Sequence, residues 1–407
     1  MGTRFRFLAG VVLPGLLLSL SACTTSSSST PTGSGPGVLF VTTQGDSSVS
    51  AYTIDLTTGT LNANGDSVPT GSVPAAMIAS PSGTALFVAN SNSSIPPNSP
   101  ACTLPSPGTI TAYTVGTDGT LTAASGSSPA GFIPLAMAID SGGHFLFVAN
   151  QGLQCDPTSG TISVFAIKDA TLTEVPGSPF RSSAPLAPSG TGPAGVAVTP
   201  DGKFLYVSDQ YDNTVTTFSV DASGVLTRGP VVPVGTSPSA LAISPSGGFL
   251  YVANASTVSG FAICNQIVTS CNDPNAPDGI LAPITGSPFS AGLGPTSIVV
   301  APSGKFMFVV DRLSNQISEY KIATGTGELT PNTQATISTG ANPVSAAIRV
   351  GTTIDATTGG TTNYLYVAEL GASSLSIYTF DSTKGTLGRV GAPITIDGGQ
   401  PSALAAE

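Results

Sequence analysis

The stretch GTSPSALAISPSGGFLYVAN, residues 235–254, decides the fold because versions of it recur along the chain. Each version joins a Gly-x-x-Pro turn to a strand that reads Leu/Met-Phe/Tyr-Val. From each of the first five prolines to the leucine or methionine of that strand the chain runs twelve residues, as from Pro238 to Leu250, and the sixth unit carries ten more. The seven prolines, each three residues after a glycine, are Pro74, Pro134, Pro193, Pro238, Pro295, Pro343 and Pro401.

Units of about 45 to 60 residues with several short strands are the sequence sign of a propeller. Within residues 193–229 we expect strands at 194–198, 204–207 and 214–220, and an outer strand from 225. The turn Pro200-Asp201-Gly202-Lys203 separates the first two strands, because proline, aspartate and glycine each favour a tight turn. The unit is therefore predicted to be a four-stranded antiparallel blade.

The second strands, such as Phe204-Leu205-Tyr206-Val207, are apolar on both alternating faces. A sheet that is covered on one side alternates apolar with polar residues instead. Both faces are therefore expected to be buried, as they are when each blade lies between two neighbours.

The two ends of the chain carry incomplete units. Leu39-Phe40-Val41 has no Gly-x-x-Pro before it, and Pro401 has no such strand after it. We expect residues 401–406 to form the innermost strand of the blade that begins at Val38, so that seven blades close into a ring. The predicted fold is an all-β, seven-bladed propeller over residues 37–407.

The N-terminus predicts export. Arg4 and Arg6 precede an apolar stretch, 8–20, that is too short for an ordinary membrane span and has the form of a signal peptide. The following Leu20-Ser21-Ala22-Cys23 is similar to the bacterial lipobox, which predicts a lipoprotein signal peptide over 1–22 and lipid attachment at Cys23. Residues 23–36, rich in Ser and Thr, are expected to be a tether. The predicted location is the cell envelope, on the outer membrane or facing the periplasm or cell surface.

Four further cysteines are present, and an even count in an exported protein predicts two disulfides. We expect Cys264–Cys271 across a loop between the third and fourth strands of one blade, and Cys102–Cys155 between enlarged loops of adjacent blades. Stapling of these loops is preferred to metal binding, because the sequence has no Cys-x-x-Cys and no suitable histidine. We expect neither a metal site nor a cofactor.

The charge balance excludes some partners. Without residues 1–22 the chain keeps ten basic residues against 22 acidic ones, a net charge of −12. Such a surface does not favour nucleic acid or anionic lipid headgroups, so membrane contact is expected through the lipid anchor alone. An envelope protein, a glycan, a small neutral ligand or a cation remains open as a partner, and we expect a monomer.

The repeated strands carry a resemblance to known families. Phe87-Val88-Ala89-Asn90, Tyr251-Val252-Ala253-Asn254 and their equivalents resemble the YVTN repeat of surface-layer and secreted propellers. Together with Pro-Asp-Gly-Lys-Phe-Leu-Tyr-Val at 200–207 and the Gly/Ala-x-Leu after each third strand, they also resemble the seven-bladed lactonase family, which includes 6-phosphogluconolactonase-like and carboxymuconate-cyclase-like proteins. The resemblance covers the chain after the tether. It implies lactone hydrolysis or cycloisomerase-type chemistry, with histidine and arginine in a central funnel.

The candidate site residues follow from the repeat. His144 is the chain's one histidine, and it is expected in a hairpin turn on the face opposite the ends of the second strands. Asp209, Asp311 and Glu369 are the acid or base candidates at those ends, with Arg312 and Arg181 as accompanying cations. A structural role, in which such polar residues bond the backbone, and a ligand contact are both open. The expected ring of polar strand ends is Thr43, Asn90, Asn150, Asp209, Asn254, Asp311 and Glu369.

Two functions compete at this point. The anchor, the tether, the missing catalytic histidine and the stapled loops favour a lipid-anchored binding or interaction module at the cell envelope, without catalysis. The family resemblance favours the alternative, a lactone hydrolase. The sequence excludes neither of them.

Overall fold

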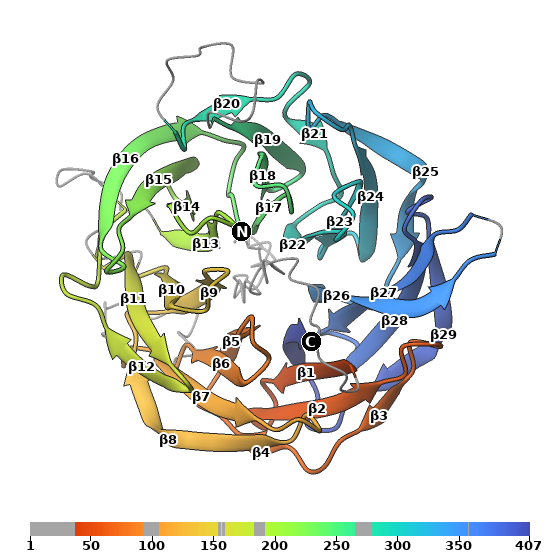
Figure 1. The fold of residues 1–407 in the computed structure, drawn as a ribbon, viewed down its shortest axis with the longest axis horizontal. Coiled ribbons are helices and arrows are strands. Elements are labelled where there is room, and N and C mark those ends of the chain that lie inside the picture. The colour runs from red at the N-terminus through yellow and green to blue at the C-terminus, as the bar shows by residue number, and fades with distance from the viewer. Residues whose placement is uncertain are drawn as a thin grey trace, which may run out of the picture.

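The computed structural model describes residues 37–92, 106–153, 156, 159–182, 192–264, 278–356 and 358–407. These residues form an all-β propeller of seven blades around a central axis (Figure 1). The described residues include no helix long and apolar enough to cross a membrane. The predicted signal peptide, Cys23 and the tether lie outside the described residues and stay predictions.

The first four blades contain the strands up to residue 233, together with the C-terminal strand. The first blade has β1 (Gly37–Thr43), β2 (Ser48–Ile54), β3 (Leu61–Ala63) and β4 (Val68–Pro69), together with the C-terminal strand β30 (Pro401–Ala406). The second has β5 (Pro74–Ala79), β6 (Ala85–Asn90), β7 (Thr109–Val115) and β8 (Leu121–Pro129). The third has β9 (Pro134–Ile139), β10 (Phe145–Asn150), β11 (Thr161–Lys168) and β12 (Thr171–Glu174). The fourth has β13 (Pro193–Val198), β14 (Phe204–Asp209), β15 (Thr214–Val220) and β16 (Leu226–Pro233).

The remaining three blades follow the same order, from the axis outward. The fifth has β17 (Leu241–Ile243), β18 (Phe249–Ala253), β19 (Thr257–Ile263), β20 (Leu281–Pro283) and β21 (Phe289–Ser290). The sixth has β22 (Pro295–Val300), β23 (Phe306–Asp311), β24 (Gln316–Ile322) and β25 (Leu329–Ser338). The seventh has β26 (Pro343–Ile354), β27 (Thr361–Glu369), β28 (Ser374–Asp381) and β29 (Leu387–Thr395). All neighbouring strands pair antiparallel, which confirms the predicted blades.

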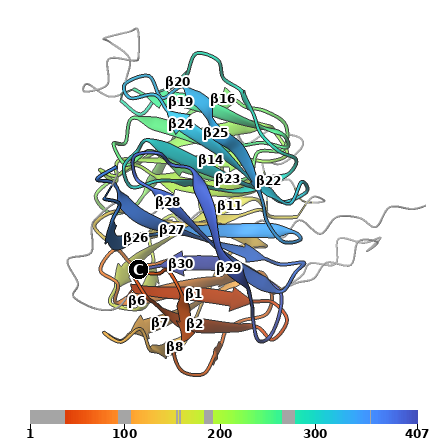
Figure 2. The same cartoon turned by 90° about the vertical axis from the view of Figure 1, so that its right-hand side faces the viewer.

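The ring closes as predicted. Strand β30 pairs antiparallel with β1, with Leu39 opposite Ala406 and Val41 opposite Leu404 (Figure 2). The backbone N–H and C=O of Glu407 also bond Val38, at 2.8 and 3.0 Å. The first blade is therefore built from both ends of the propeller domain.

The ten extra residues of the sixth repeat unit lengthen the hairpin between β26 and β27. This hairpin reaches the outer turn of the first blade, where the backbone N–H of Thr352 donates to the Leu56 carbonyl at 2.9 Å. Thr353 Oγ1 donates to the Thr57 carbonyl at 3.3 Å, and the Tyr364 hydroxyl donates to the same carbonyl at 2.6 Å. The insertion therefore adds contacts across the seam at which the ring closes.

The blades bury their faces against one another through a repeated contact. The glycine of Gly-x-Leu, in the turn after the third strand, lies against the ring at or near the start of the second strand of the preceding blade, as Gly327 does on Phe249. Tyrosines in three such strands also donate to the glycine carbonyl: Tyr206 to Gly279 at 2.9 Å, Tyr251 to Gly327 at 2.8 Å and Tyr366 to Gly59 at 2.9 Å. The equivalent ring contacts are Gly59 on Tyr364, Gly224 on Phe145, Gly279 on Phe204 and Gly385 on Phe306.

Closure generates the first prediction. Truncation after Gly399 removes β30 and leaves the inner edge of β1 unpaired and the faces of two neighbouring blades open. We expect the shortened chain to aggregate, because each blade is stabilised mainly by its neighbours. Size-exclusion chromatography and thermal unfolding provide the measurement. A soluble monomer with an unchanged melting temperature would contradict the closure described here.

The glycine-on-ring contact generates the second prediction. Gly325 and Gly327 lie in one turn with φ of +90° and +71°, so alanine strains the backbone at either position. A Cβ on Gly325 meets nothing within 4 Å, whereas a Cβ on Gly327 collides with the ring of Phe249. We expect Gly327→Ala to lower the free energy of unfolding by about 1–3 kcal/mol more than Gly325→Ala, as for other overpacked sites. Equal losses in denaturant titration would show that this contact does not stabilise the packing of the sixth blade on the fifth.

Candidate functional site

The Gly-x-x-Pro turns bind the ends of the second strands. In all seven turns the residue before proline has a positive φ, between +50° and +63°. In six blades its carbonyl accepts the backbone N–H of the residue that follows the polar strand end, as Val73 does from Ser91 at 3.0 Å and Gly294 from Arg312 at 3.0 Å. A positive φ at residues other than glycine costs free energy, so these hydrogen bonds hold a conformation that the residues do not favour by themselves.

The ring of polar strand ends lies inside the blades. All seven residues are at most 1% exposed, so they form a ring as predicted but do not face solvent. Asn150 illustrates the role: its Nδ2 donates to Thr161 Oγ1 at 3.2 Å and to Ser163 Oγ at 3.0 Å on the third strand. Asn90 makes the equivalent bond to Thr111 and accepts from Thr70, in the loop before its turn. These side chains join the second strand, the third strand and the turn.

The glycine of the turn is needed for this packing. A Cβ on Gly71 would lie 2.6 Å from the side chain of Asn90, and one on Gly292 would lie 2.5 Å from the carboxylate of Asp311. Such distances are shorter than real Cβ contacts. The Gly-x-x-Pro repeat is therefore explained by the polar side chain that it covers.

The three acidic candidates have the same structural role. Asp209 accepts from Ser182 Oγ at 2.5 Å and from Thr216 Oγ1 at 2.6 Å, and Asp311 accepts from Ser318 Oγ at 2.6 Å. Burial raises the pKa of Asp209 and of Asp311 to about 6. Glu369 accepts from two serines of β28 and from the backbone N–H of Gly340. The geometry supports the structural role over the ligand contact for all three.

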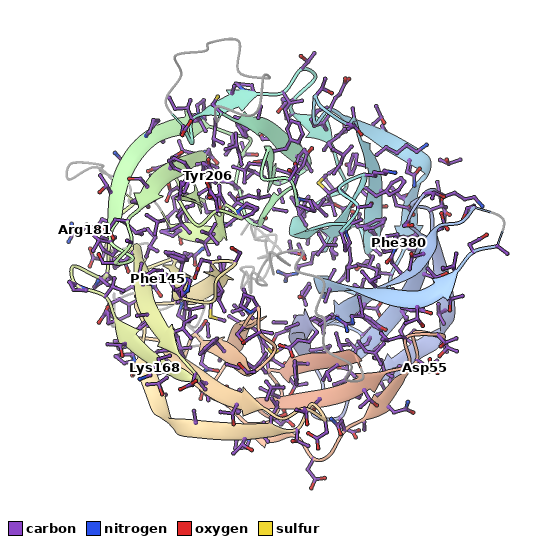
Figure 3. All side chains as sticks on the ribbon, in the orientation of Figure 1. Asp55, Phe145, Lys168, Arg181, Tyr206 and Phe380 are labelled. Carbon is purple, nitrogen blue, oxygen red and sulfur yellow. The ribbon has the colours of Figure 1, made fainter. Side chains whose placement is uncertain are left out.

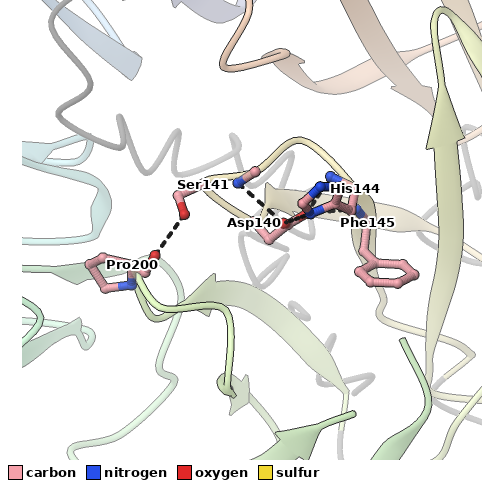
Figure 4. A network of polar contacts seen from close by, with 6 residues as sticks. Asp140, Ser141, His144, Phe145 and Pro200 are labelled. Atoms are coloured by element: carbon pink, nitrogen blue, oxygen red, sulfur yellow. Dashed lines mark hydrogen bonds and ion pairs between the residues drawn. The ribbon is translucent and has the colours of Figure 1, made fainter. Parts of the chain in front are cut away.

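His144 lies in the hairpin turn where the sequence places it. Its Nδ1 is 3.0 Å from Asp140 Oδ2, and 73% of its side chain is exposed (Figure 4). Ser141 is close in sequence, but its hydroxyl donates to the Pro200 carbonyl of the next blade at 2.6 Å (Figure 4). Asp140, Ser141 and His144 therefore form a turn and a link between blades rather than a nucleophile with its base.

Two further predictions concern Arg181 and the cysteines. Arg181 is exposed at the periphery of the propeller (Figure 3), whereas the hydroxyl of the next residue, Ser182, donates to the buried Asp209; a role of Arg181 beside the strand-end candidates stays a prediction. The length of a loop does not show at which radius its residues lie. Of the predicted disulfide cysteines, Cys264 is described and is buried. Cys102, Cys155 and Cys271 lie outside the described residues, so both pairings stay predictions.

A second ring lies one residue beyond the polar strand ends, beside the innermost strands. Several of its members tie neighbouring blades together: Gln44 Nε2 donates to the Pro74 carbonyl at 3.2 Å, and Ser91 Oγ donates to the Pro134 carbonyl at 3.3 Å. Gln151 Nε2 donates to Gln210 Oε1 of the next blade at 2.7 Å. The members of this axial ring are Gln44, Ser91, Gln151, Gln210, Ala255, Arg312 and Leu370.

Arg312 is the one charged member of the axial ring. It is 8% exposed, and its Nε and Nη1 have no hydrogen-bond partner within the described part of the chain. Burial lowers the pKa of the guanidinium. Neighbouring side chains of an extended strand point to opposite faces, so the carboxylate of Asp311 and the guanidinium of Arg312 are expected on different sides of the strand. A buried guanidinium with free donors is suited to an anion or an oxyanion.

Sequence reasoning named Arg312 but missed the ring to which it belongs. Aligning the repeat units one residue past the strand ends gives Gln, Ser, Gln, Gln, Ala, Arg and Leu. The arginine departs from the other polar members, and that departure was available in the sequence. The absence of a partner was not, because it depends on contacts between blades.

The structure thus defines a seven-bladed propeller with an arginine held beside its axis. Residues 157–266 and 272–405, together more than half of the chain, match the family described as "Lactonase, 7-bladed beta-propeller". The chain belongs to this lactonase family, as the repeated motifs indicated. No curated protein sequence matches the chain significantly.

Solved structures of the same fold cover nearly the whole chain. A putative 6-phosphogluconolactonase from Bacteroides uniformis is 20% identical, with a TM-score of 0.68 over 92% of this chain and 100% of that one. A second putative 6-phosphogluconolactonase, from Bacteroides fragilis, is 22% identical, with a TM-score of 0.68 over 92% and 99%. The periplasmic gluconolactonase of Pseudomonas aeruginosa is 20% identical, with a TM-score of 0.69 over 92% and 99%. At these identities the likeness establishes the fold alone.

The structural role of Asp311 generates a pH prediction. Its pKa is raised from 3.8 to about 6 in the folded protein, so the folded state keeps a proton that the unfolded chain releases. The free energy of unfolding therefore falls as pH rises through this window and changes no further above it. We expect Asp311→Asn to remove about 2–3 kcal/mol of this loss between pH 4 and 7, because asparagine fills the same place in other blades.

Denaturant titration at several pH values measures the effect. Asp66→Asn serves as the control, since Asp66 is exposed. A wild-type pH dependence that persists in Asp311→Asn would show that Asp311 is ionised in the folded protein.

Proposed function

We propose that this protein is a lactone hydrolase and that Arg312 forms the centre of its reaction site. The observation that carries the proposal is the buried, unpartnered guanidinium in the axial ring. Every glutamine and serine of that ring donates to or accepts from a neighbouring blade, whereas Nε and Nη1 of Arg312 have no such bond among the described residues. A buried donor without a partner carries a desolvation cost that a bound anion would remove.

Lactone hydrolysis makes a specific demand on such a site. Water adds to the ester carbonyl carbon and gives up a proton to the solvent, the carbonyl oxygen becomes negative, and the ring C–O bond then breaks as the leaving oxygen takes up a proton. The product is a hydroxy acid that carries a carboxylate. Arg312 would stabilise the oxyanion during the reaction and would bind the carboxylate afterwards, because guanidinium donors suit both.

This proposal replaces the non-catalytic binding module as the preferred function. Membership of the lactonase family supports it, and so do the names of neighbours in that fold, which are given as 6-phosphogluconolactonases and a gluconolactonase. The chain departs from the resemblance in one respect: its single histidine lies in an exposed turn. Arg312 is therefore assigned the electrostatic role, and the carboxylates of the strand ends keep their structural one.

We also propose that the protein is exported and anchored by lipid at Cys23, on the basis of the N-terminal sequence. In that location the substrate would be a lactone outside the cytoplasm. Retention of radiolabelled fatty acid by the wild type and its loss in Cys23→Ala would test the anchor.

Arg312→Gln tests the reaction site. Glutamine is already present at the equivalent place in three blades, so the fold is expected to tolerate it. We expect kcat/KM for lactone hydrolysis to fall by about 100- to 1,000-fold, the usual cost of losing an oxyanion donor. The measurement is proton release from sugar and aliphatic lactones by the full chain, with Arg181→Gln as a peripheral control that keeps wild-type activity.

Two results would contradict the proposal. Absence of turnover of every lactone by the folded wild type would exclude hydrolysis as the function. Full activity of Arg312→Gln would place the reaction elsewhere on the propeller.

A further inference from the structure

We infer that the substrate is a lactone with an alkyl substituent, which packs on Leu293 and Leu313 beside Arg312; this inference rests on the proposed function. Leu293 is 58% exposed and Leu313 is 51% exposed. Leu293 is in the Gly-x-x-Pro turn of the sixth blade, and Leu313 directly follows Arg312 in the turn that faces it. An apolar pair therefore belongs to the same hydrogen-bonded turn as the backbone of Arg312.

The two leucines are held in place by the backbone. The N–H of Leu313 donates to the Leu293 carbonyl at 3.0 Å, and the N–H of Leu293 donates to Ser314 Oγ at 2.9 Å. Gly294 lies under Leu313, since a Cβ there would be 2.7 Å from Leu313 Cγ. The φ of +63° at Gly294 allows its carbonyl to accept a hydrogen bond from the backbone N–H of Arg312. The turn thus fixes both leucines and the arginine together.

The sixth blade alone combines an arginine with two aliphatic residues at these three positions, although a large residue occurs singly in other blades, as Phe132 does in the third and Tyr211 in the fourth. The positions equivalent to Leu293 and Leu313 are Ser72 and Asn92 in the second blade, and Ala341 and Gly371 in the seventh. Small or polar residues thus serve the turn well, and the fold itself does not require leucine. Blade packing does not explain two half-exposed leucines, because a buried position is what stabilises such side chains.

The combination selects one class of ligand. A lactone whose carbonyl oxygen meets Arg312 would lay an alkyl chain across Leu293 and Leu313 and remove both from water. A polyhydroxylated lactone in the same place would leave its hydroxyls against two side chains with no hydrogen-bonding atoms, which costs affinity. The geometry therefore favours aliphatic lactones over sugar lactones.

The experiment compares γ-decalactone, which carries a hexyl chain, with unsubstituted γ-butyrolactone and a sugar γ-lactone, using the full chain. We expect the wild type to prefer γ-decalactone by tenfold or more in kcat/KM. The double variant Leu293→Ser/Leu313→Ser should lose that preference through a lower rate on γ-decalactone, while its rate on γ-butyrolactone stays within about twofold. Ile354→Ser is the matched control: it removes a 68% exposed side chain on a peripheral hairpin and should change neither rate. Melting temperatures exclude unfolding as the cause.

The outcomes separate this inference from the proposed function. Equal or faster hydrolysis of the sugar lactone by the wild type would overturn the inference and leave the proposed function intact. If no lactone is hydrolysed, calorimetry with 4-hydroxydecanoate decides: binding that requires both Arg312 and the leucines supports the alkyl subsite without catalysis. Absence of that binding would overturn both.

Discussion

The propeller depends on the close approach between the glycine of each Gly-x-x-Pro turn and the polar side chain that ends the second strand. Where the glycine is described, as at Gly71 and Gly292, a Cβ would collide with that side chain. The polar group is thereby buried, and a buried amide or carboxyl must find partners, which the third strand and the turn supply. One contact thus fixes the strand ends, the turn and the start of the innermost strand.

The same contact determines which residues can reach a ligand. The polar side chains at the strand ends are buried and hydrogen-bonded within the blades. The residue that follows each of them is therefore the first whose side chain can lie beside the axis. Gln44, Ser91, Gln151 and Gln210 use this place to connect blades, and Arg312 does not. The sixth blade therefore combines the standard backbone of the repeat with side chains that serve no evident structural purpose, a combination that is common at functional sites.

The fold was accessible from the sequence because its determinants are local. The alternation of apolar residues and the turn chemistry predicted strand 214–220 to the residue, and the unmatched ends at Val41 and Pro401 predicted the closing strand. The candidate site was accessible only in part. Burial of Asn150 or Asp311 depends on a turn that folds back over it, and the position of Arg181 depends on the path of a long loop. The free donors of Arg312 depend on how the blades pack around it, which no periodicity in the sequence reveals.

A crystal structure of the full chain with bound 4-hydroxydecanoate tests the central claim most directly. The account predicts the carboxylate within hydrogen-bond distance of Arg312 Nε or Nη1, and the alkyl chain in contact with Leu293 and Leu313. A hydroxy acid bound at the turn of His144, or at the periphery near Arg181, would contradict it.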